Sequence, residues 1–355
     1  MAEQQEKSIL HISNAPHIKT PDSVTKIMWM VVIAMSPAAI YGIYLFGIKA
    51  LIVLVASVIA AVAAEVVTQY LLKKPITIKD GSAVVTGLLV GMNVPPGAPV
   101  WVVVLGSFFA IIIVKQLFGG LGFNVFNPAL AARAFMVASW PVQMTTPWHK
   151  FSGVNVLSPD AVNRIGLKKE AFDALTQATP LGVLKEGPKI LQEFNISLQQ
   201  MYDMIFSPEM LKSMAIGNIG GVIGETSAVL LLLGGIFLMY KRIITWHIPL
   251  SFIGTVGVFA FAYYGFLGFP MPHLFAFTHV VSGGLFLGAF FMATDMVTSP
   301  ITPIGMIVFG IGCGAITFVI RIWGGFPEGV SYSILLMNAV VPLIDRYIRP
   351  RIFGR

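Results

Sequence analysis

Five ionisable side chains interrupt otherwise apolar stretches of the sequence: Glu65, Arg133, Glu225, Asp295 and Asp345. A charged group is costly inside a lipid bilayer, so a charge retained in an apolar run is a candidate for function. Carboxylates suit hard cations such as Na⁺, and they also carry protons. We therefore expect Glu65, Asp295 and Asp345 to contribute to an ion pathway.

A structural role is open for each of these carboxylates. Asp295 and Asp345 end apolar runs, where a helix end can simply be solvated. Glu225 lies in the first turns of an apolar run, where a carboxylate compensates the helix dipole equally well. Glu65 would be structural if it paired with Arg133.

The segment Gly119–Ala129 adds a further candidate, with the sequence GGLGFNVFNPA. Asn127 followed by Pro128 predicts a helix start, with the asparagine as N-cap and the proline at the first position. A helix N-terminus can hold an anionic group, although a tight turn between helices is an equal alternative. We add Asn127 to the candidates for the ion pathway.

Metal and nucleotide chemistry find little support in the sequence. Cys313 is the single cysteine, so it cannot form an internal disulfide or supply a four-cysteine cluster by itself. His247, His273 and His279 are dispersed, without metal-ligand spacing on one helix face, so we predict no metal site. The sequence contains no Walker motif. Redox chemistry would have to come from an organic cofactor or a partner chain.

Composition indicates the elements that position these side chains. The chain of 355 residues is 56% hydrophobic and 11% charged, whereas soluble domains carry about a quarter charged residues. We predict an all-α polytopic membrane protein with about ten transmembrane helices, five on either side of a long polar stretch. The apolar runs are 27–47, 50–72, 82–94, 98–118, 128–140, 217–240, 246–266, 276–294, 303–321 and 329–345.

Lysines and arginines in short loops orient these helices. They concentrate on the side of the N-terminus, which places both termini in the cytosol and the long polar loop outside. The net charge of +7 then reflects topology, and we predict no nucleic-acid partner. The predicted order is a cytosolic tail (1–26), a first transmembrane repeat (27–140), an external loop (141–214), a second repeat (215–345) and a basic cytosolic tail (346–355).

A weak internal similarity predicts that the halves are inverted repeats. Residues 87–96 and 288–300 are each a short glycine-containing span that ends at a polar residue and a proline, and Gly-Gly pairs follow at 119–120 and 324–325. Interrupted spans in equivalent places of two halves indicate a central transport site. The alternative is that glycine and proline are simply common at helix ends.

The polar loop contains Asp173-Ala-Leu-Thr176-Gln-Ala178-Thr179-Pro-Leu. Alone, this segment predicts a short helix end and a Thr-Pro turn. It also resembles the acceptor motif of flavin transferases, in which Asp, two residues, Ser/Thr, Gly, Ala and Thr/Ser follow one another. Asp173, Thr176, Ala178 and Thr179 match this motif, and Gln177 departs from its glycine.

The whole chain resembles the RnfD/NqrB family, the large membrane subunits of the Rnf and Na⁺-pumping NADH:quinone reductase complexes. The resemblance is carried by residues 13–19 (SNAPHIK), 119–135 (GGLGFNVFNPALAARAF), 173–181 and 292–300 (MATDMVTSP). The length and the short N-terminal tail are more similar to RnfD. The resemblance implies a urea-transporter-like architecture of two repeats in the cytoplasmic (inner) membrane of a bacterium or archaeon.

The resemblance also implies the activity. The chain would be the D subunit of an enzyme that moves electrons between ferredoxin and NAD, coupled to Na⁺ or H⁺ transport and active only within the complex. FMN would be esterified to Thr179. The family also binds a second flavin, non-covalent riboflavin, and the spacing of residues does not assign its binding site here. Implied partners are a flavin transferase, a second flavoprotein (the G subunit), the small membrane subunits A and E, and subunits B and C.

Two other functions fit the residues alone. One is a channel or secondary transporter without a redox role, and the other is a structural membrane scaffold for redox subunits. A covalently bound flavin on Thr179 would discriminate the redox subunit from both.

Overall fold

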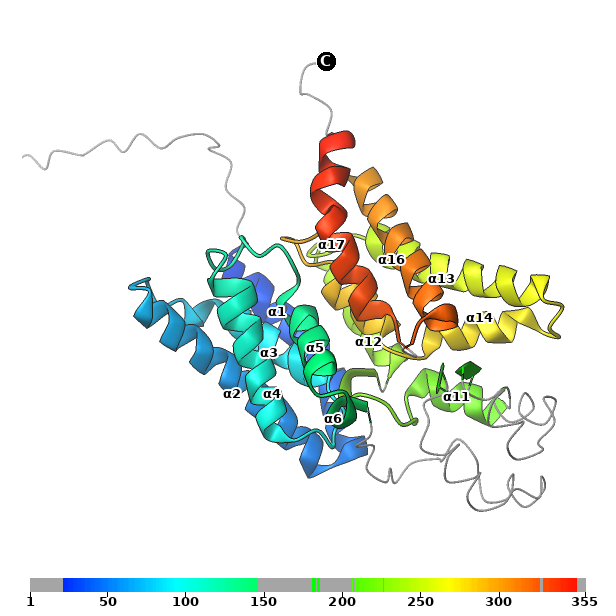
Figure 1. Cartoon of the computed structure of the whole chain (residues 1–355), viewed down its shortest axis with the longest axis horizontal. Helices are drawn as coiled ribbons and strands as arrows, with labels where there is room; N and C mark the ends of the chain where they lie inside the picture. Colours follow the sequence, from blue (N-terminus) through cyan, green and yellow to red (C-terminus); the bar gives the residue numbers. More distant parts are fainter. Residues whose placement is uncertain are drawn as a thin grey trace, which may run out of the picture.

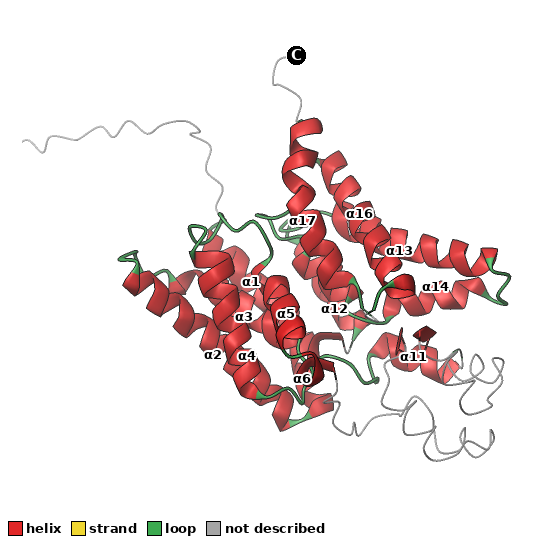
Figure 2. Ribbon diagram, in the orientation of Figure 1, coloured by secondary structure: helices red, strands yellow, loops and turns green. Residues whose placement is uncertain are grey.

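The computed structural model describes residues 22–145, 181–182, 184–185, 206, 208–225, 227–325 and 328–349. All regular secondary structure within these residues is helical (Figure 2). The predicted fold class, an all-α polytopic membrane protein, is confirmed by these helices.

The first half of the chain forms one group of helices. Its longest members are joined by Gly47, whose φ of 73° allows the tight turn between them. One helix passes directly into a π-helical segment, η2, in which the backbone winds more loosely. The group comprises α1 (Val24–Phe46), α2 (Ile48–Leu71), η1 (Ile78–Asp80), α3 (Ser82–Met92), α4 (Val100–Phe108), η2 (Phe109–Gln116), α5 (Pro128–Ser139) and α6 (Pro141–Thr145).

The second half forms another group, which contains a broken helix. Thr302 caps α16 by accepting a hydrogen bond from the Gly305 amide, and Pro303 occupies the first helical position. The group comprises α11 (Pro208–Ile216), η3 (Ile223–Glu225), α12 (Ala228–Tyr240), α13 (His247–Phe266), α14 (Pro272–Val281), α15 (Leu285–Leu287), the π-helical η4 (Gly288–Met292), α16 (Pro303–Trp323) and α17 (Val330–Tyr347).

Several of these helices can cross a membrane. By length and apolar composition α1, α2, α13 and α16 qualify, and a fifth span is added if α14 and Leu285–Met292, bent by 59°, form one crossing. Shorter apolar helices cover 82–92, 100–116, 128–139 and 228–240. Helices therefore occupy each of the ten apolar runs, while the ten-span count and the inverted repeats stay predictions.

The two groups contact each other through a few helices. In Figure 1 the blue-to-green helices α1–α5 lie on one side and the yellow-to-red helices α13–α17 on the other. α1 packs against α12, and α5 packs against α17. Gly234 of α12 faces the carbonyl of Ala34, with room for no side chain. Small residues allow such close helix contact in membranes.

The two groups also share a packing pattern. α2 packs against α3 and α4, and α13 packs against α14 and α16. Large apolar side chains cover the outside of both groups, among them Ile59 of α2 and Val258 of α13, which are more than half exposed. Such faces suit lipid rather than water.

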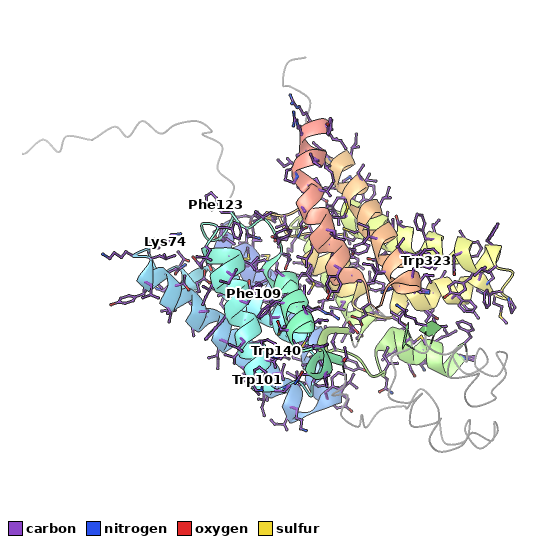
Figure 3. All side chains as sticks on the ribbon, in the orientation of Figure 1. Lys74, Trp101, Phe109, Phe123, Trp140 and Trp323 are labelled. Carbon is purple, nitrogen blue, oxygen red and sulfur yellow. The ribbon has the colours of Figure 1, made fainter. Side chains whose placement is uncertain are left out.

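Aromatic and basic residues mark opposite ends of the first group (Figure 3). Trp101 and Trp140 lie together at one end, in an edge-to-face contact with ring centroids 5.1 Å apart. Lys74 and Phe123 lie at the other end, where the Lys74 ammonium donates to the Gly119 carbonyl. Tryptophans at an interface and lysines on the cytosolic side are typical of membrane proteins.

Candidate functional site

The flavin-acceptor motif is the first predicted site. Its residues, Asp173, Thr176, Ala178 and Thr179, lie outside the described residues. The described chain resumes at Leu181, which is buried and packs against Gly283 in the break between α14 and α15. The chain that follows the motif thus reaches the broken helix of the second half.

A cavity of about 370 Å³ lies between the two helix groups. Its walls are mainly apolar and come from α1, α3, η4, α12 and the segment before α5. Cavities of roughly 300–1,000 Å³ with a few polar groups are typical of small-molecule sites. The polar lining residues are Ser82, Thr86, Lys115, Asn124, Asn127, Thr294 and Asp295.

Asn127 forms the helix start that the sequence predicts. Its side-chain oxygen accepts hydrogen bonds from the amides of Ala129 (3.0 Å) and Leu130 (3.3 Å), and Pro128 occupies the first helical position. The prediction of an N-cap is therefore confirmed. Its side-chain amide also donates to the carbonyl of Met292 at the end of η4, 3.2 Å away. One side chain thus joins α5 of the first group to the broken helix of the second.

Asp295 lies in the connection after η4, beside the same cavity. Its carboxylate accepts hydrogen bonds from the Val297 amide and the Thr298 hydroxyl, both 3.3 Å away. Burial raises the pKa of Asp295, and these hydrogen bonds, with one from the Asn124 side chain, oppose that rise. Asp345 does not line the cavity: in the last turn of α17 it accepts from the Ile301 amide at 3.1 Å.

Glu65 is buried in α2 and paired, but its partner is not Arg133. One carboxylate oxygen accepts hydrogen bonds from the Lys115 ammonium (2.8 Å), the Gln116 amide (2.8 Å) and the Gln69 amide (3.3 Å). Lys115 also donates to the Ser82 hydroxyl at 2.7 Å. The suggested pairing of Glu65 with Arg133 was wrong, because α2 faces η2 rather than α5 at this depth.

Lys115 is a site residue that the sequence pattern indicates only as an inner-side charge. The side chains of Lys115 and Glu65 are 2% and 1% exposed, and Lys115 lines the cavity. It lies in the π-helical segment η2, and π-helical turns are frequent at functional sites. The sequence feature that could have indicated this site is a lysine followed by a glutamine near the end of an apolar run.

Arg133 instead lies at the centre of a second buried cluster. Its Nη1 donates to the side-chain oxygen of Asn93 at 2.9 Å, and its Nη2 donates to Glu328 Oε2. The same Nη2 lies 3.7 Å from Glu225 Oε1. Glu225 belongs to the short turn η3 before α12, not to the first turns of that helix. Glu328 is not among the residues that the sequence predicts.

This cluster adjoins the break at residues 282–284. Arg321 of α16 donates to the carbonyls of His279 and Ser282, at the C-terminal end of α14. A Cβ atom on Gly284 would lie 3.3 Å from Glu225 Oε1, and one on Gly283 would lie 3.0 Å from Arg321 Nη2. The two glycines therefore let the broken backbone approach both charged groups.

The histidines do not form a metal cluster in the part of the chain that the structure describes. There, no group of three or more His, Cys, Asp or Glu side chains is arranged to hold a metal ion. His279 faces the Tyr264 hydroxyl at 3.4 Å instead.

Known proteins are similar to this sequence over nearly its full length. The model of the NQR2, RnfD, RnfE family matches residues 11–354. The D subunit of the proton-translocating ferredoxin:NAD(+) oxidoreductase complex of Clostridium ljungdahlii is 48% identical over 361 residues, which cover 100% of this chain and 99% of the relative. The D subunit of the Na(+)-translocating complex of Acetobacterium woodii is 46% identical, covering 97% and 95%.

A third relative is the D subunit of the ion-translocating oxidoreductase complex of Stutzerimonas stutzeri. It is 45% identical over a match that covers 94% of this chain and 93% of the relative. The family match and the relatives agree with the family that the sequence motifs predict. The relatives are named as subunits of an ion-translocating oxidoreductase. The chain belongs to the NQR2, RnfD, RnfE family of membrane subunits.

Proposed function

We propose that the chain is the D subunit of an Rnf-type complex, and that it carries electrons on covalently bound FMN between ferredoxin and NAD while the complex translocates Na⁺ or H⁺. The observation that carries this proposal is similarity to D subunits over the full length of both chains. The names of these relatives differ in their ion, one a proton and one Na⁺, so the ion is left as Na⁺ or H⁺.

Thr179 is the proposed attachment point of FMN, within the motif that includes Asp173, Thr176 and Ala178. Leu181, two residues further along the chain, packs against Gly283 at the broken helix. Because consecutive Cα atoms are about 3.8 Å apart, a group attached to Thr179 would be tethered close to this break. Flavins exchange one or two electrons, and the protein supplies position and electrostatics.

The cavity between the two helix groups is the proposed site of the second, non-covalent flavin. Its walls offer apolar surface for a flat ring system, and the amides of Asn124 and Asn127 and the hydroxyls of Thr86 and Thr294 offer hydrogen bonds to a polar ring edge. Lys115 adds a positive charge to the same wall. These residues would orient the ring and exclude water from it.

The same cavity supports an ion pathway on the cytosolic side. Asp295 and Asn127 line it, and Glu65 lies behind Lys115 as that lysine's counterion. Asp345 fixes the connection that carries Asp295, through its bond to Ile301. We assign Asp295 the direct role, since it is the candidate carboxylate that reaches the cavity wall.

The proposed orientation has both termini in the cytosol and residues 141–214 outside. The start of α1 and the end of α17 lie in the upper part of Figure 1, whereas α6 and α11, which flank the long loop, lie in the lower part. Lys74 marks the cytosolic end and the pair Trp101–Trp140 the outer end (Figure 3). The partners would be subunits A, B, C, E and G, the flavin transferase and the lipid bilayer.

The decisive experiment is in-gel flavin fluorescence. The chain is expressed with its cognate flavin transferase, denatured and viewed under ultraviolet light. We expect a fluorescent wild-type band, a dark band for Thr179→Ala, and a fluorescent band for the control Thr145→Ala, which lies at the start of the same loop outside the motif. A dark wild-type band would remove the flavoprotein function and leave the transporter or the scaffold.

A further inference from the structure

Buried polar atoms without a hydrogen-bond partner gather at the break between α14 and α15. Across the described residues, seven buried side-chain atoms lack such a partner, and four of them belong to Glu225, His279, Ser282 and Arg321. Buried polar groups are normally paired, and most strictly so at membrane depth. A concentration of unpaired atoms therefore marks a place where water or a small cation can bind.

Two carboxyl groups share one guanidinium at this place. Nη2 of Arg133 contacts Glu328 Oε2 and lies 3.7 Å from Glu225 Oε1. The carboxyl groups of Glu225 and Glu328 therefore lie next to each other around one cation. Two ionised carboxylates that share one site repel each other, and a proton on one of them removes this repulsion. Two carboxyl groups beside one guanidinium are therefore an arrangement that can hold one proton.

The surrounding charges favour this state. Arg321 is engaged by the carbonyls of His279 and Ser282, at the end of α14 where the helix dipole is negative. Arg133 is the cation that contacts both carboxyl groups, and one guanidinium neutralises one carboxylate. Two carboxyl groups that share one guanidinium in a buried site cannot both ionise easily. The charged groups facing the pair are Arg133 and Arg321, with Tyr332 beside Arg133 and His279 beside Arg321.

Access to the pair is uneven. The side chain of Glu225 is 4% exposed, while those of Arg133 and Glu328 are 14% and 17% exposed. Glu328 therefore offers the route by which a proton reaches water. Gly284 leaves Glu225 Oε1 just enough room, because a Cβ atom there would lie 3.3 Å away.

We propose that Glu225 and Glu328 form a proton-binding carboxyl pair, held by Arg133 at the broken helix, that takes up and releases one proton. On release, one –COOH group becomes –COO⁻ and the proton passes to water. Arg133 belongs to the first helix group, and both glutamates belong to the second, so protonation sets the contact between the halves. The inference rests on the proposed function only where it links this proton to transport.

Infrared difference spectroscopy of the purified whole complex tests the proton directly. We expect a carbonyl stretch of a protonated carboxyl group that shifts in deuterated water. The band is lost in Glu225→Gln and in Glu328→Gln, and it is retained in the control Asp22→Asn, which removes an exposed carboxylate. Glu225→Gln keeps the shape of the protonated side chain, so the complex should assemble, which the yield of intact complex verifies.

Two outcomes would overturn the proton site. One is a wild-type spectrum without the band, or with a band unchanged in both glutamine variants. The other is loss of the wild-type band on addition of Na⁺, which would identify a Na⁺ site in its place.

Transport is read separately in membrane vesicles. Glu225→Gln should lower ion uptake per electron transferred at least tenfold while ferredoxin:NAD electron transfer continues. Unchanged uptake would refute the link to transport even if the band is present. Absence of covalent flavin or of electron transfer in wild type would refute the proposed function and leave the infrared result standing.

Discussion

Replacing Lys115 by methionine removes the cation that neutralises Glu65 inside the first helix group. Both side chains are almost fully buried, and the ammonium lies 2.8 Å from the carboxylate. In Lys115→Met, Glu65 keeps two amide donors, Gln116 and Gln69, but no counterion. Removing one partner of a buried ion pair costs about 3–5 kcal/mol, since a buried charge is left uncompensated.

The reciprocal change Glu65→Gln leaves Lys115 with the Ser82 hydroxyl and an amide oxygen, and it should cost a similar amount. The double variant Glu65→Gln/Lys115→Met removes both charges. Replacing a whole buried pair by neutral side chains of similar volume is often close to neutral. We therefore expect the double variant to regain most of the stability that either single change loses.

The assay is the thermal midpoint of the detergent-solubilised complex for wild type, both single variants and the double variant. The control is Lys26→Met, which breaks the exposed pair Lys26–Asp22 and should cost no more than about 1 kcal/mol. Additive losses in the double variant would refute the reasoning, because they would show that the two charges do not stabilise each other. Ion uptake by the stable double variant then reports whether Glu65 acts beyond pairing Lys115.

Three further changes have specific expected results. Asn127→Ala should lower stability by about 1–2 kcal/mol, because it removes a helix cap and the bond to the η4 carbonyl; Asn127→Asp, which keeps the cap but not the donor, should lose less in the same thermal assay. Asp295→Asn and Asp345→Asn should each lower vesicle ion uptake more than electron transfer, and unchanged uptake in both would remove these residues from the pathway. Gly284→Val should reduce assembly, measured as the yield of intact complex, because its side chain enters the space of Glu225. Gly254→Val, at a position with open space around it, should assemble normally, and equal yields of the two valine variants would contradict the close packing at the break.

Local signals in the sequence predict the helices well. Glycine, proline or charged residues bound each apolar run, so the helices from α1 to α5 begin and end within a few residues of the predicted ranges. The Asn127–Pro128 pair also predicts its own helix start, because capping depends on neighbours within three residues. The sixth run is less well placed: hydropathy starts it at residue 217, whereas α12 begins at Ala228 after the turn η3.

The partners of buried charges could not be predicted in the same way. Glu65 and Lys115 are fifty residues apart, and Arg133 and Glu328 are nearly two hundred apart. Which of them meet depends on how α2, η2, α5 and the segment before α17 pack. Hydropathy and spacing give the depth of a charge along its own helix but not the helix that faces it, and so Glu328 was missed.

The placement of these partners has a consequence for biogenesis. Glu65 finds its counterion within the first helix group, so α2, α3 and η2 can neutralise each other as soon as they have been synthesised. Within the described first group, the side chain that accepts a hydrogen bond from Arg133 is the neutral Asn93. The two carboxylates that contact Arg133, those of Glu225 and Glu328, are synthesised later. A lone arginine at the centre of a membrane helix costs about 2.5–3.5 kcal/mol on insertion scales. The short helix α5 should therefore settle in the bilayer only after the second half has arrived, and fragments ending before Glu225 should be poorly retained.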